Sequence, residues 1–292
     1  MPDPSRLAKG LESGAFIVTC ELDPPKGTAW SLVEPKIAAL KNKIQAVVVS
    51  DNPKARMHMA PIGFCLYLIE QGIEPIMTMT CRDRNRLALQ SDLLAAAGLG
   101  LQNILAVTGD YITWGDHPES KPVYDLDSIQ LIWAINQLNL GRDISGGIIE
   151  GPAPLFTVGG AVTLTADPIL PQILKFRKKQ QVGADFFISH PIFDLPGVEE
   201  FFKQISEIKT PLLASMCLLK EEQVREYVPA KYPGLLVPES MLARFKTLNS
   251  AKFQSGMIEC TANLIQAIKN DGRFRGVHLM MQGAEERIGK II

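Results

Sequence analysis

The sequence has few cysteines, no excess of either charge and no long apolar run. Its five cysteines are an odd number and include no CxxC pair, a pattern that argues against a disulfide framework or a structural zinc site. Lysine and arginine number 30 and aspartate and glutamate 31, so the charge gives no reason to expect a nucleic acid or an acidic membrane as partner. No apolar stretch approaches the roughly 20 residues that a membrane-spanning helix needs.

Several binding motifs are missing as well. The sequence contains no GxGxxG fingerprint at a strand-to-helix turn and no P-loop. No two histidines or cysteines have the spacing of metal ligands, so we expect no metal site. Residues 1–14 lack the apolar core of a signal peptide. These absences lead us to expect reduced thiols in a cytoplasmic protein.

Short apolar runs rich in Val, Ile and Phe alternate with longer stretches of helical spacing. Eight runs are typical of parallel strands buried on both faces: Phe16–Leu22, Ala46–Asp51, Glu74–Cys81, Asn103–Asp110, Leu155–Val162, Asp185–His190, Pro211–Cys217 and Arg275–Met280. Helices are predicted between them, for example at Val33–Lys43, Arg86–Leu99, Leu126–Leu138, Ile169–Gln181 and Val198–Lys209, with two more in Pro238–Asp271. Eight strand–helix repeats predict a single (β/α)8 barrel domain over residues 1–292. An open sheet of six strands with extra strands is the alternative.

In such a barrel, the carboxyl ends of the strands hold the chemistry. Glu21 closes the first apolar run and Asp110 closes the fourth. Partial burial there would raise the pKa of a carboxyl group and make it a useful acid near neutral pH. The same positions also suit a salt bridge to a barrel arginine such as Arg82 or Arg84. Spacing alone therefore leaves both a catalytic and a structural role open.

Glycines and histidines add weaker signals. Gly109, and Gly159–Gly160 in the fifth run, would let a flat ligand approach the backbone, or would only relieve crowding in the barrel. His190 ends the sixth run, where a functional and a structural role are about equally expected. His278 lies within the eighth run and is expected to be a core residue.

Two motifs resemble segments of bacterial methylenetetrahydrofolate reductases: TCRDRN at Thr80–Asn85 and NILAVTGD at Asn103–Asp110. Val123–Ser128 and Gly183–Phe186 also fit, and the resemblance covers nearly the whole chain. It implies a barrel that holds FAD at its carboxyl-terminal face. It also implies hydride transfer from reduced flavin to 5,10-methylenetetrahydrofolate, which yields 5-methyltetrahydrofolate.

The resemblance also implies roles for individual residues. Glu21 matches the acid that helps to open the five-membered ring of the substrate, and Asp110 matches the aspartate that lies beside the flavin and contacts the pterin. The flavin-contacting positions of the family correspond to Ser50, Gly109, Ala161 and Lys179 in this sequence. The lysine would bind the cofactor phosphates as a point charge.

The sequence departs from the family around the substrate. His190, in Ser189–His190–Pro191, stands where the family usually has a pterin-binding glutamine. We still expect His190 to bind substrate, together with Glu21 and Asp110. Thr78 replaces a histidine that contacts the flavin in some members, and Ala161–Leu164 departs from the usual end of the fifth strand.

The partners follow from the same resemblance. We expect a folate-type pterin as substrate, NAD(P)H or a partner redox protein as electron donor, and a homo- or hetero-oligomer. Two alternatives stay open. One is a pterin-binding barrel that transfers a methyl group without flavin, and the other is a flavin-bearing subunit that needs a second chain.

Overall fold

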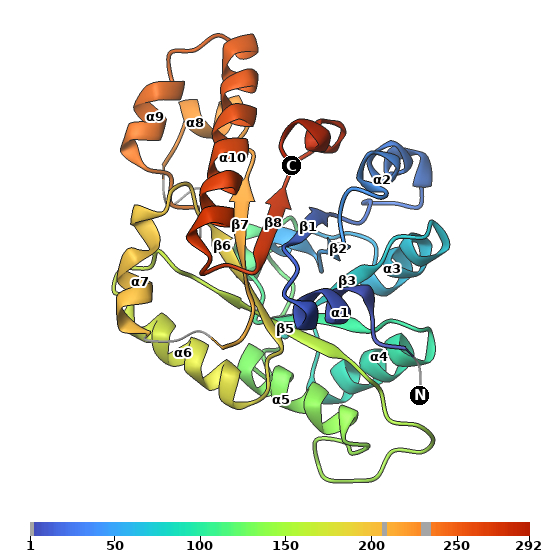
Figure 1. Ribbon diagram of the computed structural model, residues 1–292. Coiled ribbons are helices and arrows are strands. Elements are labelled where there is room, and N and C mark those ends of the chain that lie inside the picture. The colour runs from blue at the N-terminus through green and yellow to red at the C-terminus, as the bar shows by residue number, and fades with distance from the viewer. Residues whose placement is uncertain (1–2, 206–208, 229–234) are drawn as a thin grey trace.

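The computed structural model describes residues 3–205, 209–228 and 235–292. Eight parallel strands close into a barrel in chain order, which confirms the predicted (β/α)8 fold (Figure 1). The strands are β1 (Ile17–Leu22), β2 (Ala46–Val49), β3 (Pro75–Thr80), β4 (Asn103–Val107), β5 (Thr157–Val162), β6 (Phe186–Pro191), β7 (Leu212–Cys217) and β8 (Gly276–Met280). All eight predicted runs contain a strand, because strands buried on both faces need apolar residues at nearly every position.

Helices surround the barrel. They are α1 (Arg6–Ser13), α2 (Glu34–Leu40), α3 (Pro61–Glu70), α4 (Arg86–Gly98), α5 (Ser128–Asn139), α6 (Leu170–Gln181), α7 (Glu199–Gln204), α8 (Glu221–Arg225), α9 (Glu239–Phe245) and α10 (Ser250–Asp271). The two helices predicted before the last strand are confirmed as α9 and α10. The helix predicted to run from Val198 to Lys209 is too long, because Ile205 is extended after α7; residues 206–208 lie outside the described residues.

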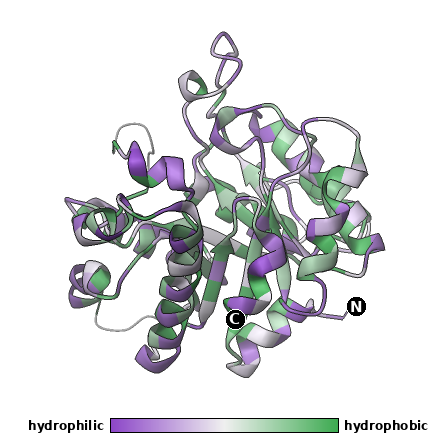
Figure 2. Ribbon diagram, turned by 90° about the horizontal axis from the view of Figure 1, so that it is seen from above, coloured by the Kyte–Doolittle hydropathy of each residue, from purple (hydrophilic) through white to green (hydrophobic). Residues whose placement is uncertain are grey.

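Figure 2 shows largely hydrophobic strands at the centre and many hydrophilic residues on the surrounding helices. None of the helices in the described part of the chain is both long and apolar enough to cross a membrane.

Helix α1 closes the amino-terminal end of the barrel. Its side chains Leu7 and Leu11 are buried against inward-facing residues of the strands, Ile17 among them. The backbone N–H groups of Arg6 and Leu7 donate hydrogen bonds to the carboxylate of Glu74, just before β3. The carboxyl-terminal end of the barrel is therefore the end that is available for a site.

The two adjacent glycines of β5 lie where the barrel has no room for side chains. A Cβ atom on Gly159 would lie 2.3 Å from the Phe186 ring, and one on Gly160 would lie 3.2 Å from the Phe187 ring. Phe186 belongs to the inward-facing cluster that fills the barrel. These glycines therefore relieve crowding between β5 and β6.

Candidate functional site

The mouth of the barrel contains a cavity of about 490 Å³. All of its lining residues come from the connection between β4 and α5, residues 108–127, except His190 at the end of β6. Ligand pockets in proteins commonly measure roughly 300–1,000 Å³. Three of the predicted site residues, Gly109, Asp110 and His190, thus share one cavity of suitable size.

Gly109 shapes this cavity through its backbone. It adopts φ +96°, which disfavours any residue with a side chain. A Cβ atom at this position would also lie 2.9 Å from Cβ of Arg82. The glycine therefore turns the chain so that Asp110 reaches the cavity. Oδ2 of Asp110 then accepts a hydrogen bond of 2.9 Å from the backbone N–H of Lys54.

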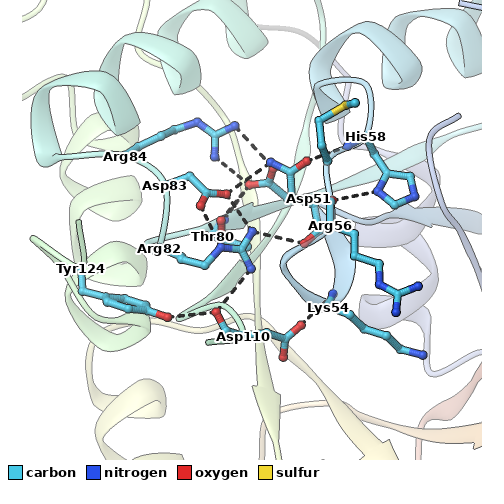
Figure 3. Close-up of polar contacts among 12 residues, drawn as sticks. Asp51, Lys54, Arg56, His58, Thr80, Arg82, Asp83, Arg84, Asp110 and Tyr124 are labelled. Atoms are coloured by element: carbon cyan, nitrogen blue, oxygen red, sulfur yellow. Dashed lines mark hydrogen bonds and ion pairs between the residues drawn. The ribbon is translucent and has the colours of Figure 1, made fainter. Parts of the chain in front are cut away.

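A network of charged side chains fixes the loops after β2 and β3 (Figure 3). Asp51 is buried and accepts hydrogen bonds from Nη1 of Arg84, at 2.7 Å, and from the backbone and hydroxyl of Thr80, at 2.9 and 3.1 Å. Arg82 is only 1% exposed and donates to both carboxylate oxygens of Asp83 at 2.7 Å.

This network bears on the structural role considered for the site carboxylates. Arg82 and Arg84 were the expected salt-bridge partners of Glu21 or Asp110. The salt bridges of Arg82 and Arg84 instead join Asp83, Asp51 and Asp92. Arg82 donates to the backbone carbonyl of Asp110 at 3.5 Å and acts on its carboxylate only at longer range, and neither arginine forms a salt bridge with Glu21 or Asp110 in the described part of the chain.

The loop that follows β2 is strained and held in place by these contacts. Asn52, Lys54 and Ala55 have φ values of 45°, 55° and 55°, which non-glycine residues rarely adopt. The carbonyl oxygen of Asn52 accepts a hydrogen bond from Arg82, and its amide oxygen accepts one from the backbone of His58. From this loop, the cationic side chain of Lys54 acts electrostatically on Glu21 and lowers the pKa of its carboxyl group.

Glu21 lies at the mouth of the barrel on the inward face of β1. It pairs in register with Val48, which is part of the inward-facing cluster. Among the described residues, none donates a hydrogen bond to its carboxyl group. Burial raises the pKa of Glu21 to about 8; Asp23 and Asp110 contribute to the increase, and Lys54 opposes it. This carboxyl group therefore keeps its proton at neutral pH. Glu21 does not itself line the cavity.

Ser50 and Asp23 form a pair beside Glu21. The hydroxyl of Ser50 donates a hydrogen bond of 2.6 Å to Oδ1 of Asp23. Glu21 and Asp23 are two residues apart at the end of β1, a spacing that places side chains on the same face of a strand. Ser50, predicted to contact a flavin, thus fixes Asp23, whose charge raises the pKa of Glu21.

His190 presents its imidazole to the cavity. Among the described residues, none makes a hydrogen bond to the ring. Desolvation at the cavity and the charge of Lys179 lower the pKa of His190, whereas Asp110 raises it, and the residue stays accessible to solvent. In its neutral form the ring offers one nitrogen as donor and the other as acceptor.

Lys179 and Ala161 are bonded to each other and do not face open space. The ammonium group of Lys179 is buried and donates a hydrogen bond of 2.7 Å to the carbonyl oxygen of Ala161. Burial lowers the pKa of Lys179 to about 8, and Lys175 lowers it further.

The core role expected for His278 is confirmed. Its ring is buried, Nδ1 lies 3.0 Å from the hydroxyl of Thr19, and burial lowers its pKa to about 4.

Sequence reasoning missed the aromatic side of the cavity. Tyr111, Trp114 and Tyr124 line it, and the Tyr124 hydroxyl donates to the Asp110 carbonyl oxygen at 3.0 Å. The available signal was the long connection after the NILAVTGD motif, which carries three aromatic residues in a chain with 7% aromatics. Within residues 3–205, 209–228 and 235–292, no group of three or more His, Cys, Asp or Glu side chains is placed to bind a metal.

Comparisons with known proteins agree on one family. The methylenetetrahydrofolate reductase family model matches residues 6–292. A probable methylenetetrahydrofolate reductase (NADPH) of Caenorhabditis elegans is 22% identical over 231 residues, which are 76% of this chain and 32% of that protein. The chain thus spans about a third of the length of this curated relative.

Solved structures show the same fold. An uncharacterized protein from Clostridium thermocellum that binds two copies of 5-methyl-5,6,7,8-tetrahydrofolic acid has a TM-score of 0.67 at 14% identity, covering 98% of both chains. A 2,3-dimethylmalate lyase has a TM-score of 0.51 at 11% identity, covering 95% of this chain and 80% of the lyase. At such identities the likeness concerns the fold alone. The match of the family model over residues 6–292 shows that the chain belongs to the methylenetetrahydrofolate reductase family.

Proposed function

We propose that the protein reduces 5,10-methylenetetrahydrofolate to 5-methyltetrahydrofolate. Membership of the reductase family supports this reaction, and so does the folate ligand of the Clostridium structure. The observation that carries the proposal is the position of the Glu21 carboxyl group on the inward face of β1 at the mouth of the barrel, where no described residue donates a hydrogen bond to it and its surroundings raise its pKa to about 8. A carboxylic acid that is protonated at neutral pH can act as a general acid.

The proton of Glu21 would be transferred to a ring nitrogen of the substrate. In the substrate, one carbon bridges two nitrogens of a five-membered ring. Proton donation from Glu21 to one nitrogen breaks its bond to the bridging carbon, and the other nitrogen then forms a double bond to that carbon. The resulting iminium carbon accepts a hydride, and the carbon becomes the methyl group of the product. Asp110 can accept a hydrogen bond from an N–H group of the pterin, and His190 can donate or accept one.

FAD is the proposed cofactor, and the cavity suits part of it. The Gly109 backbone and the Asp110 carboxylate in the cavity lining, together with two exposed aromatic side chains, fit a flat ring. When bound, FAD would supply the hydride. Ser50 and Lys179 would join the cofactor contacts by exchanging their bonds to Asp23 and to Ala161. We further propose NAD(P)H as electron donor, a cytoplasmic location and an oligomeric state.

A second candidate is a flavin-bearing subunit that takes its electrons from a partner protein. His190 favours it, because an imidazole cannot present a donor and an acceptor on one edge as an amide does. Oxidation of NADH by the isolated chain with an artificial acceptor would contradict this candidate.

The test uses the purified protein with added FAD. Absorbance shows whether flavin binds, and anaerobic mixing of the reduced protein with 5,10-methylenetetrahydrofolate shows whether the substrate reoxidises it. The proposal predicts a yellow protein whose reoxidation yields 5-methyltetrahydrofolate. A protein that stays colourless with FAD, or a reduced protein that the substrate does not reoxidise, would contradict it.

A further inference from the structure

Two aromatic side chains at the cavity are largely open to solvent. Tyr111 is 64% exposed and Trp114 is 45% exposed, although large aromatic rings are usually buried against other side chains. Their rings meet edge to face, with centroids 5.1 Å apart and an interplanar angle of 83°. Both rings line the cavity that contains Asp110 and His190. The cavity thus has a polar side and an aromatic side.

The aromatic side is held in a fixed position. Trp114 ends a short 3-10 helix, Ile112–Trp114, and the next residue packs directly against the loop after β2. A Cβ atom on Gly115 would lie only 1.8 Å from the carbonyl oxygen of Ala55, so glycine is needed for this contact.

Asp116 ties the same segment to the loop after β2 a second time and to the loop after β1. Its carboxylate accepts a hydrogen bond of 2.6 Å from Nζ of Lys26, after β1, and one of 2.9 Å from the backbone N–H of Met57, after β2. The exposed rings therefore belong to a connection that is anchored on both neighbouring loops. Exposed rings on an anchored segment are ready to bind without the cost of ordering a loose one.

We propose that Tyr111 and Trp114 form an aromatic wall in which Trp114, braced edge to face by Tyr111, stacks against a flat conjugated ring of a ligand in the cavity. The inference rests on the proposed function, because that function supplies two ligands with such rings. One is the benzoyl ring that follows the pterin in folates, and the other is the ring system of FAD. Stacking leaves the polar edge of the ligand free to meet Asp110 and His190, which line the same cavity.

The experiment measures dissociation constants by titration calorimetry for the full chain and for Trp114→Ala. The probes are 5-methyltetrahydrofolate with FAD in excess, 6-methyltetrahydropterin, which has the pterin without the benzoyl ring, and FAD added to protein stripped of flavin. Trp133→Ala is the matched control, because Trp133 is 40% exposed on α5 and does not line the cavity. Trp114→Phe keeps a flat ring, so it should retain most of the affinity if stacking is the cause.

The aromatic wall predicts that Trp114→Ala weakens binding of one ring-bearing ligand about tenfold, while Trp133→Ala does not. Loss for 5-methyltetrahydrofolate but not for 6-methyltetrahydropterin identifies the benzoyl ring, and loss for FAD identifies the flavin. Affinities for both ligands that stay within about twofold of the parent would overturn the inference. So would an equal loss in Trp114→Phe. A parent protein that binds neither ligand contradicts the proposed function itself, and with it this inference.

Discussion

Two groups of polar side chains at the mouth of the barrel differ in how fully they are paired. After β2 and β3, Asp51 and Arg82 are buried and bonded to several partners each. In contrast, the carboxyl group of Glu21 and the ring of His190 have no hydrogen-bond partner among the described residues. A polar group whose bonds are all made stabilises the fold, whereas one left without partners is available to a ligand. The first group is therefore the framework and the second is the candidate chemistry.

The variant Glu21→Gln tests most directly whether the unpaired group carries the chemistry. The amide keeps the shape but cannot donate a carboxylic proton, so reduction of 5,10-methylenetetrahydrofolate should fall about 10²–10⁴-fold. Reduction of the bound flavin should be unchanged. Stopped-flow absorbance of the two half-reactions separates these outcomes, with Glu70→Gln, an exposed residue on α3, as control. Unchanged turnover in Glu21→Gln would rule this residue out as the acid.

Asp51→Ala tests the framework side. Removing this carboxylate leaves Arg84 without its buried partner and the backbone N–H of Thr80 without an acceptor. We expect the free energy of unfolding to fall by about 3 kcal/mol. Urea unfolding measures it, and Glu200→Ala, which removes the exposed ion pair with Lys203, is the control and should barely move the midpoint. Equal midpoints for the two variants would show that the network does not stabilise the fold.

Asp23→Asn tests the charge that acts on Glu21. Asp23 raises the pKa of Glu21, so its neutralisation should lower that pKa. An acid works only while protonated, so activity should be lost as pH rises, and the loss should occur about one pH unit lower in the variant. The pH profile of substrate reduction between pH 5.5 and 9 measures this. If the basic limbs of parent and variant coincide, the charge of Asp23 does not act on Glu21.

The smallest expected effect concerns His190. His190→Ala should weaken binding of 5-methyltetrahydrofolate by about 1 kcal/mol, the net value of one hydrogen bond. His190→Gln should bind at least as tightly as the parent, because an amide offers donor and acceptor on one edge. Since desolvation lowers the pKa of His190, the difference in binding free energy between each variant and the parent should be constant above pH 7. Binding that is the same in all three proteins would make His190 a packing residue.

Much of the fold could be predicted from the sequence, because parallel strands buried on both faces leave apolar runs that are easy to recognise. The strand-end positions of Glu21 and His190 could be predicted for the same reason, whereas Asp110, expected to close the fourth strand, lies three residues beyond the end of β4. The hydrogen bonds and ion pairs between side chains could not be predicted, because partners such as Asp51 and Arg84 are brought together by the path of the loops between strands. The aromatic wall of Tyr111 and Trp114 also escaped prediction, because it lies in a connection without periodicity.

We hold that Glu21 keeps its proton at neutral pH because its burial, together with the charges of Asp23 and Asp110, outweighs the stabilising charge of Lys54. Infrared difference spectra of the parent and Glu21→Gln, recorded without substrate from pH 4 to 9, isolate the C=O stretch of this protonated carboxyl group. We predict that the band persists at pH 7 and disappears with a midpoint near pH 8. A midpoint near the ordinary glutamate value of 4.5 would contradict the account.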